Sequence, residues 1–390
     1  MQAYQIKDEV YWVGAIDWSL RTFHGYATER GSTYNAYLII DEKITLIDNV
    51  KDYLGEEMMG RISSIIDPSK IDVIISNHGE PDHSGNLLAL MKKAPNAKVY
   101  ASAPNGIKIL NAIYGELPIL PLKNGDELNI GKRTLKFIHA PMVHWPDSMV
   151  TYDAFDRILF SNDAFGQHFA TSKRWDSDVE LATALFEAKK YYANIVIPYS
   201  AQANRLLTAA KTLDLEMIAP SHGVIWKDHV ADIIGLYDYL TTSQKQNKAV
   251  VVYDTMWEST FKIAVAITEA FKDAGIPVTL YDVKTTEISD IMTDLADAKY
   301  LGVGSSTINN GMLSSIAGFL NYLHEMAPTK LRYIAFGSYG WGGQSIQMID
   351  EQLESMGYER LVPKIRINFV PKPNDLKQIR DSIMEALSKK

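Results

Sequence analysis

Four features are absent from the 390-residue sequence, and each absence excludes a class of protein or of site. There is no cysteine, which excludes disulfides, thiolate nucleophiles and cysteine-bound iron–sulfur clusters. There is no basic run, and 39 Lys and Arg against 47 Asp and Glu give a net charge of −8, so nucleic acid is not an expected partner. No window approaches about 18 apolar residues, and the N-terminus lacks a signal-peptide pattern. We therefore expect a soluble, cytoplasmic protein.

The length of the chain exceeds what one ordinary core can use, so we expect two domains. The first part is rich in short strands. A polar segment without apolar periodicity, TTSQKQNKA, follows Leu240 and is predicted to be a linker. Beyond it, strands and helices alternate, which predicts a parallel sheet with helices on both faces. The predicted domains are residues 1–248 and 249–390.

Ligand-type side chains follow four predicted strands of the first domain. The strand IDVII leads into one tight loop that carries His78, Glu80, Asp82 and His83. Three later strands end in the same way, and they lead to His144, Asp163 and His222. Loops at strand ends can converge while the sheet holds them rigid. The sequence therefore predicts that these side chains meet, although a solvated polar loop is the alternative for the first of them.

These seven candidates are too many for one metal ion and suffice for two, with one carboxylate shared. Carboxylates so close together in an apolar interior are costly unless a positive charge holds them. Three carboxylates and one bridging hydroxide bring two divalent cations close to neutrality. The pattern favours a pair of metal ions.

The second domain lacks both G-x-G-x-x-G and G-K-[ST], which disfavours a dinucleotide or a nucleoside triphosphate. The loop between its first strand and first helix reads DTMWEST. Hydroxyl and backbone N–H groups crowd a helix N-terminus there, which suits a terminal phosphate monoester.

Taken together, these motifs resemble known families. The H-x-[EH]-x-D-H loop and the final S-H-G resemble the metallo-β-lactamase fold, a four-layer αββα sandwich. Hydrolases of that fold usually have histidine and zinc where this chain has Glu80, a harder ligand that favours iron. The segments TYNAYLI, HWPDSM, NDAFGQH and SHGVIW resemble the flavodiiron proteins, or A-type flavoproteins, and this resemblance covers nearly the whole chain.

The resemblance implies a ligand set for two iron ions. One iron would take His78, Glu80 and His144, and the other Asp82, His83 and His222, with Asp163 as the bridge. In some relatives the equivalent of His83 points away from the metal, so its role stays open. His24 and His168 could line the substrate pocket, and Tyr191 or Tyr192 could support the ligands with a hydroxyl group, with packing as the alternative for these two tyrosines.

The resemblance also implies a flavodoxin-like second domain that binds FMN, with strand order 2-1-3-4-5. Three loops at strand ends would hold the cofactor. The expected contacts are Thr255, Met256, Trp257, Glu258, Ser259, Thr260, Ser305, Thr307, Ile308, Asn309, Asn310, Ser338, Tyr339, Gly340, Trp341, Gly342 and Gly343.

The function implied is reduction of dioxygen to water, of nitric oxide to nitrous oxide, or of both, at a non-haem diiron site fed by FMN. Flavodiiron proteins form head-to-tail homodimers in which each flavin faces the irons of the partner, and pairs of dimers would give a tetramer. The electron donor would be rubredoxin or a reduced deazaflavin. The sequence leaves open the preferred gas, the donor, the oligomer and the flavin potential.

Two rival functions fit parts of the sequence. One is a dinuclear zinc metallo-hydrolase with a fused flavodoxin-like module, and the other is a plain electron carrier.

Overall fold

The computed structural model describes residues 1–389, which form two compact units. The first unit comprises Met1–Tyr192 and Tyr199–Thr241, and the second comprises Ala193–Pro198 and the chain from Thr242 onward. The predicted boundary after residue 248 falls inside strand β17 (Gln246–Asp254), seven residues beyond the point at which the units part, 248 against 241. This strand begins with exposed polar residues, so its start carries no apolar signal in the sequence.

The first unit contains a mixed seven-stranded sheet in the order β1-β2-β7-β8-β9-β10-β11. The pairs from β1 to β8 are antiparallel, and those from β8 to β11 are parallel. Its strands are β1 (Tyr4–Lys7), β2 (Val10–Trp12), β7 (Tyr37–Ile39), β8 (Thr45–Ile47), β9 (Val73–Ser76), β10 (Lys98–Ser102) and β11 (Ile119–Leu122).

A second, five-stranded sheet has the order β12-β13-β14-β15-β16. Only its last pair is parallel. Its strands are β12 (Glu127–Asn129), β13 (Thr134–His139), β14 (Met149–Asp153), β15 (Ile158–Asn162) and β16 (Met217–Pro220).

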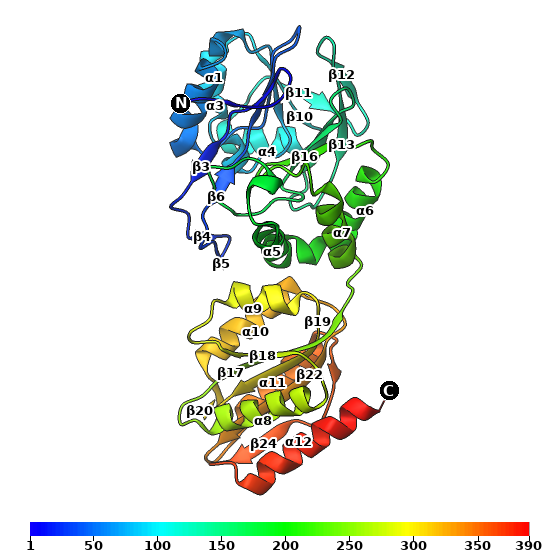
Figure 1. Ribbon diagram of the computed structural model, residues 1–390. Coiled ribbons are helices and arrows are strands. Elements are labelled where there is room, and N and C mark those ends of the chain that lie inside the picture. Colours follow the sequence, from blue (N-terminus) through cyan, green and yellow to red (C-terminus); the bar gives the residue numbers. More distant parts are fainter. Residues whose placement is uncertain (390) are drawn as a thin grey trace. The chain divides into compact units, whose positions relative to one another are not determined.

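The two sheets share one apolar core, in which Val73 and Ile75 of the first sheet pack with Phe137 and Phe160 of the second. A second core lies between the first sheet and the helices α1 (Gly55–Ser63), α3 (Leu87–Lys93) and α4 (Asn105–Tyr114). The other helices of this unit are α2 (Pro81–Ser84), α5 (Leu181–Tyr191), α6 (Ser200–Ala210) and α7 (Val230–Thr241). The unit is the predicted αββα sandwich (Figure 1).

The second unit contains a parallel sheet in the order β18-β17-β19-β22-β23, with β24 also paired to β22. This confirms the predicted order 2-1-3-4-5, with the fifth position shared by β23 and β24. Besides β17, the strands are β18 (Val278–Asp282), β19 (Ala298–Ser305), β22 (Arg332–Tyr339), β23 (Glu359–Arg360) and β24 (Ile365–Asn368).

Helices cover both faces of this parallel sheet (Figure 1). Val250 and Val252 face one core and Val251 faces the other, which explains why the part of β17 from Ala249 to Tyr253 is apolar at every position. One face carries α9 (Ile288–Leu295), α10 (Ser314–Met326) and α11 (Gln344–Ser355), and the other carries α8 (Ser259–Asp273) and α12 (Pro373–Ser388).

Three short hairpin-like pairs complete the strands of the described chain: β3 (Ala15–Asp17) with β6 (Ser32–Tyr34), β4 (Thr22–Phe23) with β5 (Tyr26–Ala27), and β20 (Thr307–Ile308) with β21 (Gly311–Met312). Within residues 1–389, no helix is both long enough and apolar enough to cross a membrane.

Candidate metal centre and cofactor cavity

The loop from β9 to α2 is folded by its own polar contacts. The N–H of Gly79 donates to Asp147 Oδ2 at 2.7 Å, and the hydroxyl of Ser84 donates to the carbonyl of Gly79 at 2.8 Å. Pro81 starts α2 at a position where its missing N–H is tolerated. As a result, the side chains of this loop leave the end of the sheet in a fixed arrangement.

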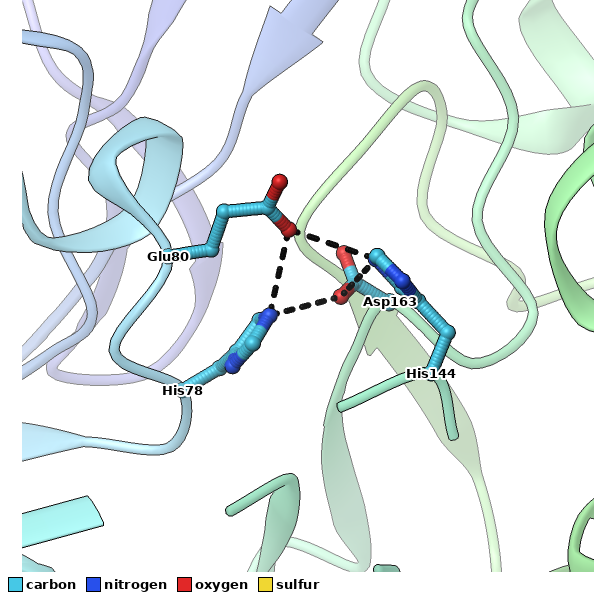
Figure 2. Close-up of side chains that lie close together, drawn as sticks. All are labelled: His78, Glu80, His144 and Asp163. Carbon is cyan, nitrogen blue, oxygen red and sulfur yellow. Dashed lines mark hydrogen bonds and ion pairs between the residues drawn. The ribbon is translucent and has the colours of Figure 1, made fainter. Parts of the chain in front are cut away.

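The structure brings all seven predicted ligand residues into two buried groups. The first group is His78, Glu80, His144 and Asp163, and the second is Asp82, His83 and His222. Within each group, one potential ligand atom from every residue lies within 4.8 Å of those of the others. Figure 2 shows the four side chains of the first group pointing toward one another.

Asp163 lies between the two groups and turns one carboxylate oxygen to each. Its Oδ2 is 3.6 Å from His78 Nε2 and 3.4 Å from His144 Nε2, while Glu80 Oε2 is 3.2 Å from both nitrogens (Figure 2).

The other oxygen of Asp163 faces the second group. Its Oδ1 is 2.9 Å from His83 Nε2 and 3.3 Å from His222 Nε2. Asp82 completes this group, with Oδ1 3.4 Å from His83 Nε2 and Oδ2 3.4 Å from His222 Nε2. His83 therefore points into the cluster in this chain.

The donor set fits two cations. Several buried atoms of the cluster have no hydrogen-bond partner within the described chain: both carboxylate oxygens of Asp82 and of Asp163, both ring nitrogens of His83, and Nε2 of His144 and His222. Buried polar atoms are almost always satisfied, so a group of unsatisfied atoms aimed at one another indicates a missing partner. Nitrogen and oxygen donors in this proportion suit iron.

The pKa shifts within the cluster also indicate a site for positive charge. Burial by itself would raise the pKa of Asp163, but the neighbouring histidines, His83 first, hold it well below its usual range. Burial lowers the pKa of His83, but Asp82 and Asp163 outweigh burial and raise it to about 9. The carboxylates thus attract positive charge strongly, whether it is carried by protons or by metal ions.

Residues outside the cluster fix the orientation of its histidines. Asp147 Oδ1 lies 3.0 Å from His78 Nδ1, and the carbonyl oxygen of Thr33 lies 2.8 Å from His222 Nδ1. Such contacts set which ring nitrogen is left to bind a metal. The sequence prediction missed Asp147, although its place three residues after His144 in the HWPDSM segment was a usable signal.

Three of the four predicted supporting residues, His24, His168 and Tyr191, lie beside the cluster. His24 Nε2 is 2.5 Å from Glu80 Oε1, and the His168 ring is centred 4.6 Å from the ring of His222. Tyr192 does not lie there, because its hydroxyl donates to Ser200 Oγ and its ring packs on Tyr237. The adjacent Tyr191 instead has its ring 5.9 Å from that of His222. Adjacent helical residues point in different directions, and the sequence did not show which one faces inward.

The second unit has a cavity of about 380 Å³ at the carboxyl ends of its strands, where two crossovers diverge from β17 and β19. This is the switch point at which sheets of this type bind ligands, and the volume suits a small cofactor. The lining residues are Met256, Trp257, Ser259, Ser306, Thr307, Asn309, Ser338, Tyr339, Gly340, Trp341, Gly342, Phe369 and Val370.

The cavity draws on all three predicted loops but not on every predicted residue. The residues expected as contacts that do not line it are Thr255, Glu258, Thr260, Ser305, Ile308, Asn310 and Gly343. Three lining residues were not among the expected contacts. Ser306 lies within one of the three predicted loops. Phe369 and Val370 follow β24, and only the fold brings that strand end beside the others.

The loop after β17 is built for an anion. The hydroxyl of Thr260 lies 3.0 Å from that of Ser306 and 2.8 Å from that of Ser338, so hydroxyls of three loops meet at the start of α8. The buried Thr255 Oγ1 has no partner in the described chain. Lys284 Nζ donates to the carbonyl of Thr255 at 3.1 Å and lies 3.0 Å from Asp254 Oδ1, so a cation stands beside this loop. A phosphate monoester fits these donors.

Fold and sites together define a two-domain protein, in which a metallo-β-lactamase-like domain with a dinuclear-type ligand cluster precedes a flavodoxin-like domain. Residues 33–223 match the family described as ODP family beta lactamase, and residues 251–382 match Flavodoxin.

Similar proteins extend over almost the full length of the chain. It is 40% identical to the nitric oxide reductase of Moorella thermoacetica, covering 97% of this chain and 96% of that protein. It is 41% identical to the rubredoxin-oxygen oxidoreductase of Megalodesulfovibrio gigas, with the same coverage of 97% and 96%. Among solved structures, the flavodiiron protein from Giardia intestinalis is similar with a TM-score of 0.96 and 34% identity, over 99% of this chain and 96% of that one. The chain belongs to the flavodiiron protein family.

Proposed function

We propose that this chain reduces dioxygen to water, nitric oxide to nitrous oxide, or both, with two iron ions held by residues 1–248 and FMN held by residues 249–390. The observation that carries the proposal is the placement of Asp163 between two buried groups of ligand-type side chains, in a chain that also has a flavodoxin-type cavity. Relatives named for each of these two reactions support both.

In this proposal, His78, Glu80 and His144 would hold one iron, Asp82, His83 and His222 would hold the other, and Asp163 would be shared by both. The support is the separate contact that each oxygen of Asp163 makes with one group. Asp147 and the carbonyl of Thr33 orient the rings, and burial of the cluster excludes bulk water from it.

When bound, the diferrous pair and reduced FMN together supply the four electrons that turn dioxygen into two waters, or the two that turn two nitric oxide molecules into nitrous oxide and water. The protein binds and orients these groups. Ser259, which lines the cavity, and the nearby hydroxyls of Thr255 and Thr260, which do not line it, would hold the FMN phosphate beside it. The exposed indoles of Trp257 and Trp341 would flank the flavin ring.

The zinc hydrolase alternative is not favoured. It leaves the cavity of the second unit without a role, and Glu80 in the cluster suits iron better than zinc. The relatives over the whole chain are oxidoreductases by name.

The active form is proposed to be a head-to-tail homodimer, with dimers pairing into a tetramer as an open extension. Large apolar side chains at the mouth of the cavity, among them Trp257 at 86% and Trp341 at 87% exposure, offer a surface for a second copy. A strictly monomeric preparation with full activity at low concentration would contradict the dimer. The proposed donor is rubredoxin or a reduced deazaflavin. The cytoplasmic location expected from the sequence stays a prediction.

One experiment tests the function. The protein is purified without oxygen, its iron, zinc and FMN are measured, and the reduced protein is mixed with dioxygen or nitric oxide in a stopped-flow instrument. We expect two irons and one FMN per chain and rapid reoxidation by at least one gas. A colourless protein that carries zinc, or a loaded protein that neither gas reoxidises, would refute the proposal.

A further inference from the structure

A short hairpin lies against the metal centre. Strands β4 and β5 pair Phe23 with Tyr26, and the two residues at the turn, His24 and Gly25, have φ values of 47° and 83°. Two consecutive positive φ values are typical of the tight turn that joins antiparallel strands. From this tip His24 reaches Glu80.

Phe23 places the hairpin against the ligands themselves. Its ring is centred 4.7 Å from that of His168 and 6.2 Å from that of His222. The position of the hairpin therefore decides how His24 and Phe23 stand over the cluster.

The segment after the hairpin is tied to helix α5 by two ion pairs. Arg30 Nε lies 2.9 Å from Glu187 Oε1, and Lys190 Nζ lies 2.7 Å from Glu29 Oε2. Glu187 and Lys190 are three residues apart, so they share one face of the helix. The two pairs fix both adjacent residues of the segment to the same two positions on α5.

The two charged residues that α5 contributes to these ion pairs are buried. The side chains of Lys190 and Glu187 are only 2% and 7% exposed, whereas those of Glu29 and Arg30 are about half exposed, at 51% and 52%. Burial raises the pKa of Glu187 to about 7, although Lys190 and Arg30 lower it. Apolar side chains would cover this surface at lower cost, so the charges are better explained by the fixed geometry that they impose.

The same helix also contacts the ligands. Tyr191 follows Lys190 directly, and its ring lies 5.2 Å from that of His168 and 5.9 Å from that of His222. Helix α5 thus contacts the cluster through Tyr191 and the segment after the hairpin through Glu187 and Lys190. Its position therefore affects both.

Building on the proposed function, we propose that Glu187 and Lys190 are positioning residues that, through Arg30 and Glu29, hold hairpin β4–β5 over the metal centre. They set the reach of His24 to Glu80 and the position of the Phe23 ring beside His168 and His222. The ion pairs described above connect both residues to the segment after the hairpin, and we expect their effect on the metal centre to pass through it.

The test compares amide hydrogen exchange in the purified, loaded protein at pH 8, where Glu187 is ionised. For Lys190→Met we expect exchange in residues 22–31 to accelerate about tenfold, with β14 and β15 unchanged. Iron and FMN contents should stay at the level of the unaltered protein. The KM for the gas should shift by about threefold, with a smaller change in kcat. Unchanged exchange in residues 22–31, or an equal acceleration throughout the first unit, would overturn the proposal.

Three further variants sharpen this test. Lys190→Arg keeps the charge and should restore slow exchange. Glu29→Gln removes the exposed partner and should reproduce the effect of Lys190→Met, which keeps the test decisive if Lys190→Met does not fold. Lys211→Met removes a similar pair with Asp238, 2.5 Å long but 43% and 48% exposed, and should leave residues 22–31 unaffected. Because exchange and iron content do not depend on gas consumption, failure of the proposed function would be seen separately.

Discussion

The metal cluster and the flavin cavity are built in opposite ways. The cluster is made of side-chain nitrogen and oxygen atoms, buried and aimed at one another, and many of them lack a hydrogen-bond partner in the described chain. The cavity is made of loop backbone, hydroxyl groups and aromatic rings, and two of its indoles are almost fully exposed. A site made of charged side chains can be predicted from the residue types in the sequence. The residues of a site shaped by loop backbone and surface aromatic rings can be identified only once the fold is known.

The largest expected effect comes from removing the side chain that both metal groups share. Asp163→Ala should abolish turnover and most iron binding, because neither group keeps its common oxygen donor, while FMN stays bound. Iron content, FMN content and gas reduction measure this. The control is Asp238→Ala, an exposed carboxylate on α7, which should change none of them. Full turnover in Asp163→Ala would disprove the bridge.

A smaller effect should follow from loosening one histidine. Asp147→Asn weakens the contact that orients His78, so iron affinity should fall by roughly 10- to 100-fold. Competition with a chelator measures the affinity, and FMN binding should not change. Asp214→Asn, at a side chain that is 76% exposed, is the matched control. Equal iron affinity in the two variants would show that His78 needs no support.

In the flavodoxin-like unit, the charge of Asp350 is expected to affect the stability of the fold and not the binding of a ligand. Burial would raise the pKa of Asp350, but Arg360, Tyr333 and Lys364 together lower it below its usual value. Ionised Asp350 therefore stabilises the folded protein fully at pH values above the usual pKa of an aspartate. This stabilisation is lost as the pH falls through the lower pKa that Asp350 has in the folded protein.

Asp350→Asn should destabilise this unit by about 2 kcal/mol near neutral pH and flatten its loss of stability below pH ~4. Denaturation followed through FMN fluorescence at a series of pH values measures both. Asp381→Asn, at an exposed ion pair 66% open to solvent, should have little effect. If the stability of Asp350→Asn fell below pH ~4 as steeply as that of the unaltered protein, another carboxylate would be responsible for the loss of stability in acid.

The smallest effect should come from the cation beside the phosphate loop. Lys284→Met removes the contacts to Thr255 and Asp254, so FMN affinity should fall about five- to tenfold, equivalent to about 1.0–1.4 kcal/mol. Titration of the flavin-free protein with FMN measures this. Iron content should not change, and Lys299→Met on β19 is the control. Equal FMN affinity in both variants would remove Lys284 from the cofactor site.

The sequence predicted that ligand-type side chains following the ends of strands would meet, and the structure brings His144, Asp163 and His222 together with the loop after β9. The sequence left open the direction of adjacent side chains, since Tyr191 and Tyr192 are indistinguishable there, whereas in the structure Tyr191 faces the cluster and Tyr192 contacts Ser200. Asp147 was missed because its role depends on His78, which is 69 residues away.

The second unit shows the same limit. Alternating strands and helices predicted its sheet and strand order, because local periodicity dictates elements and parallel connections restrict topology. Phe369 and Val370 were not predicted, since their place at the cavity depends on the pairing of β24 with β22.

The sequence by itself determined the two-part organisation, the layered sheets and the identity of the side chains that gather in the buried cluster, because these depend on local apolar patterns and on residue chemistry. Only the tertiary structure decided which oxygen of Asp163 faces which group, how α5 holds the hairpin, and which aromatic rings border the cavity. These features depend on distances between residues far apart in the chain, and such distances are set only when the core has packed.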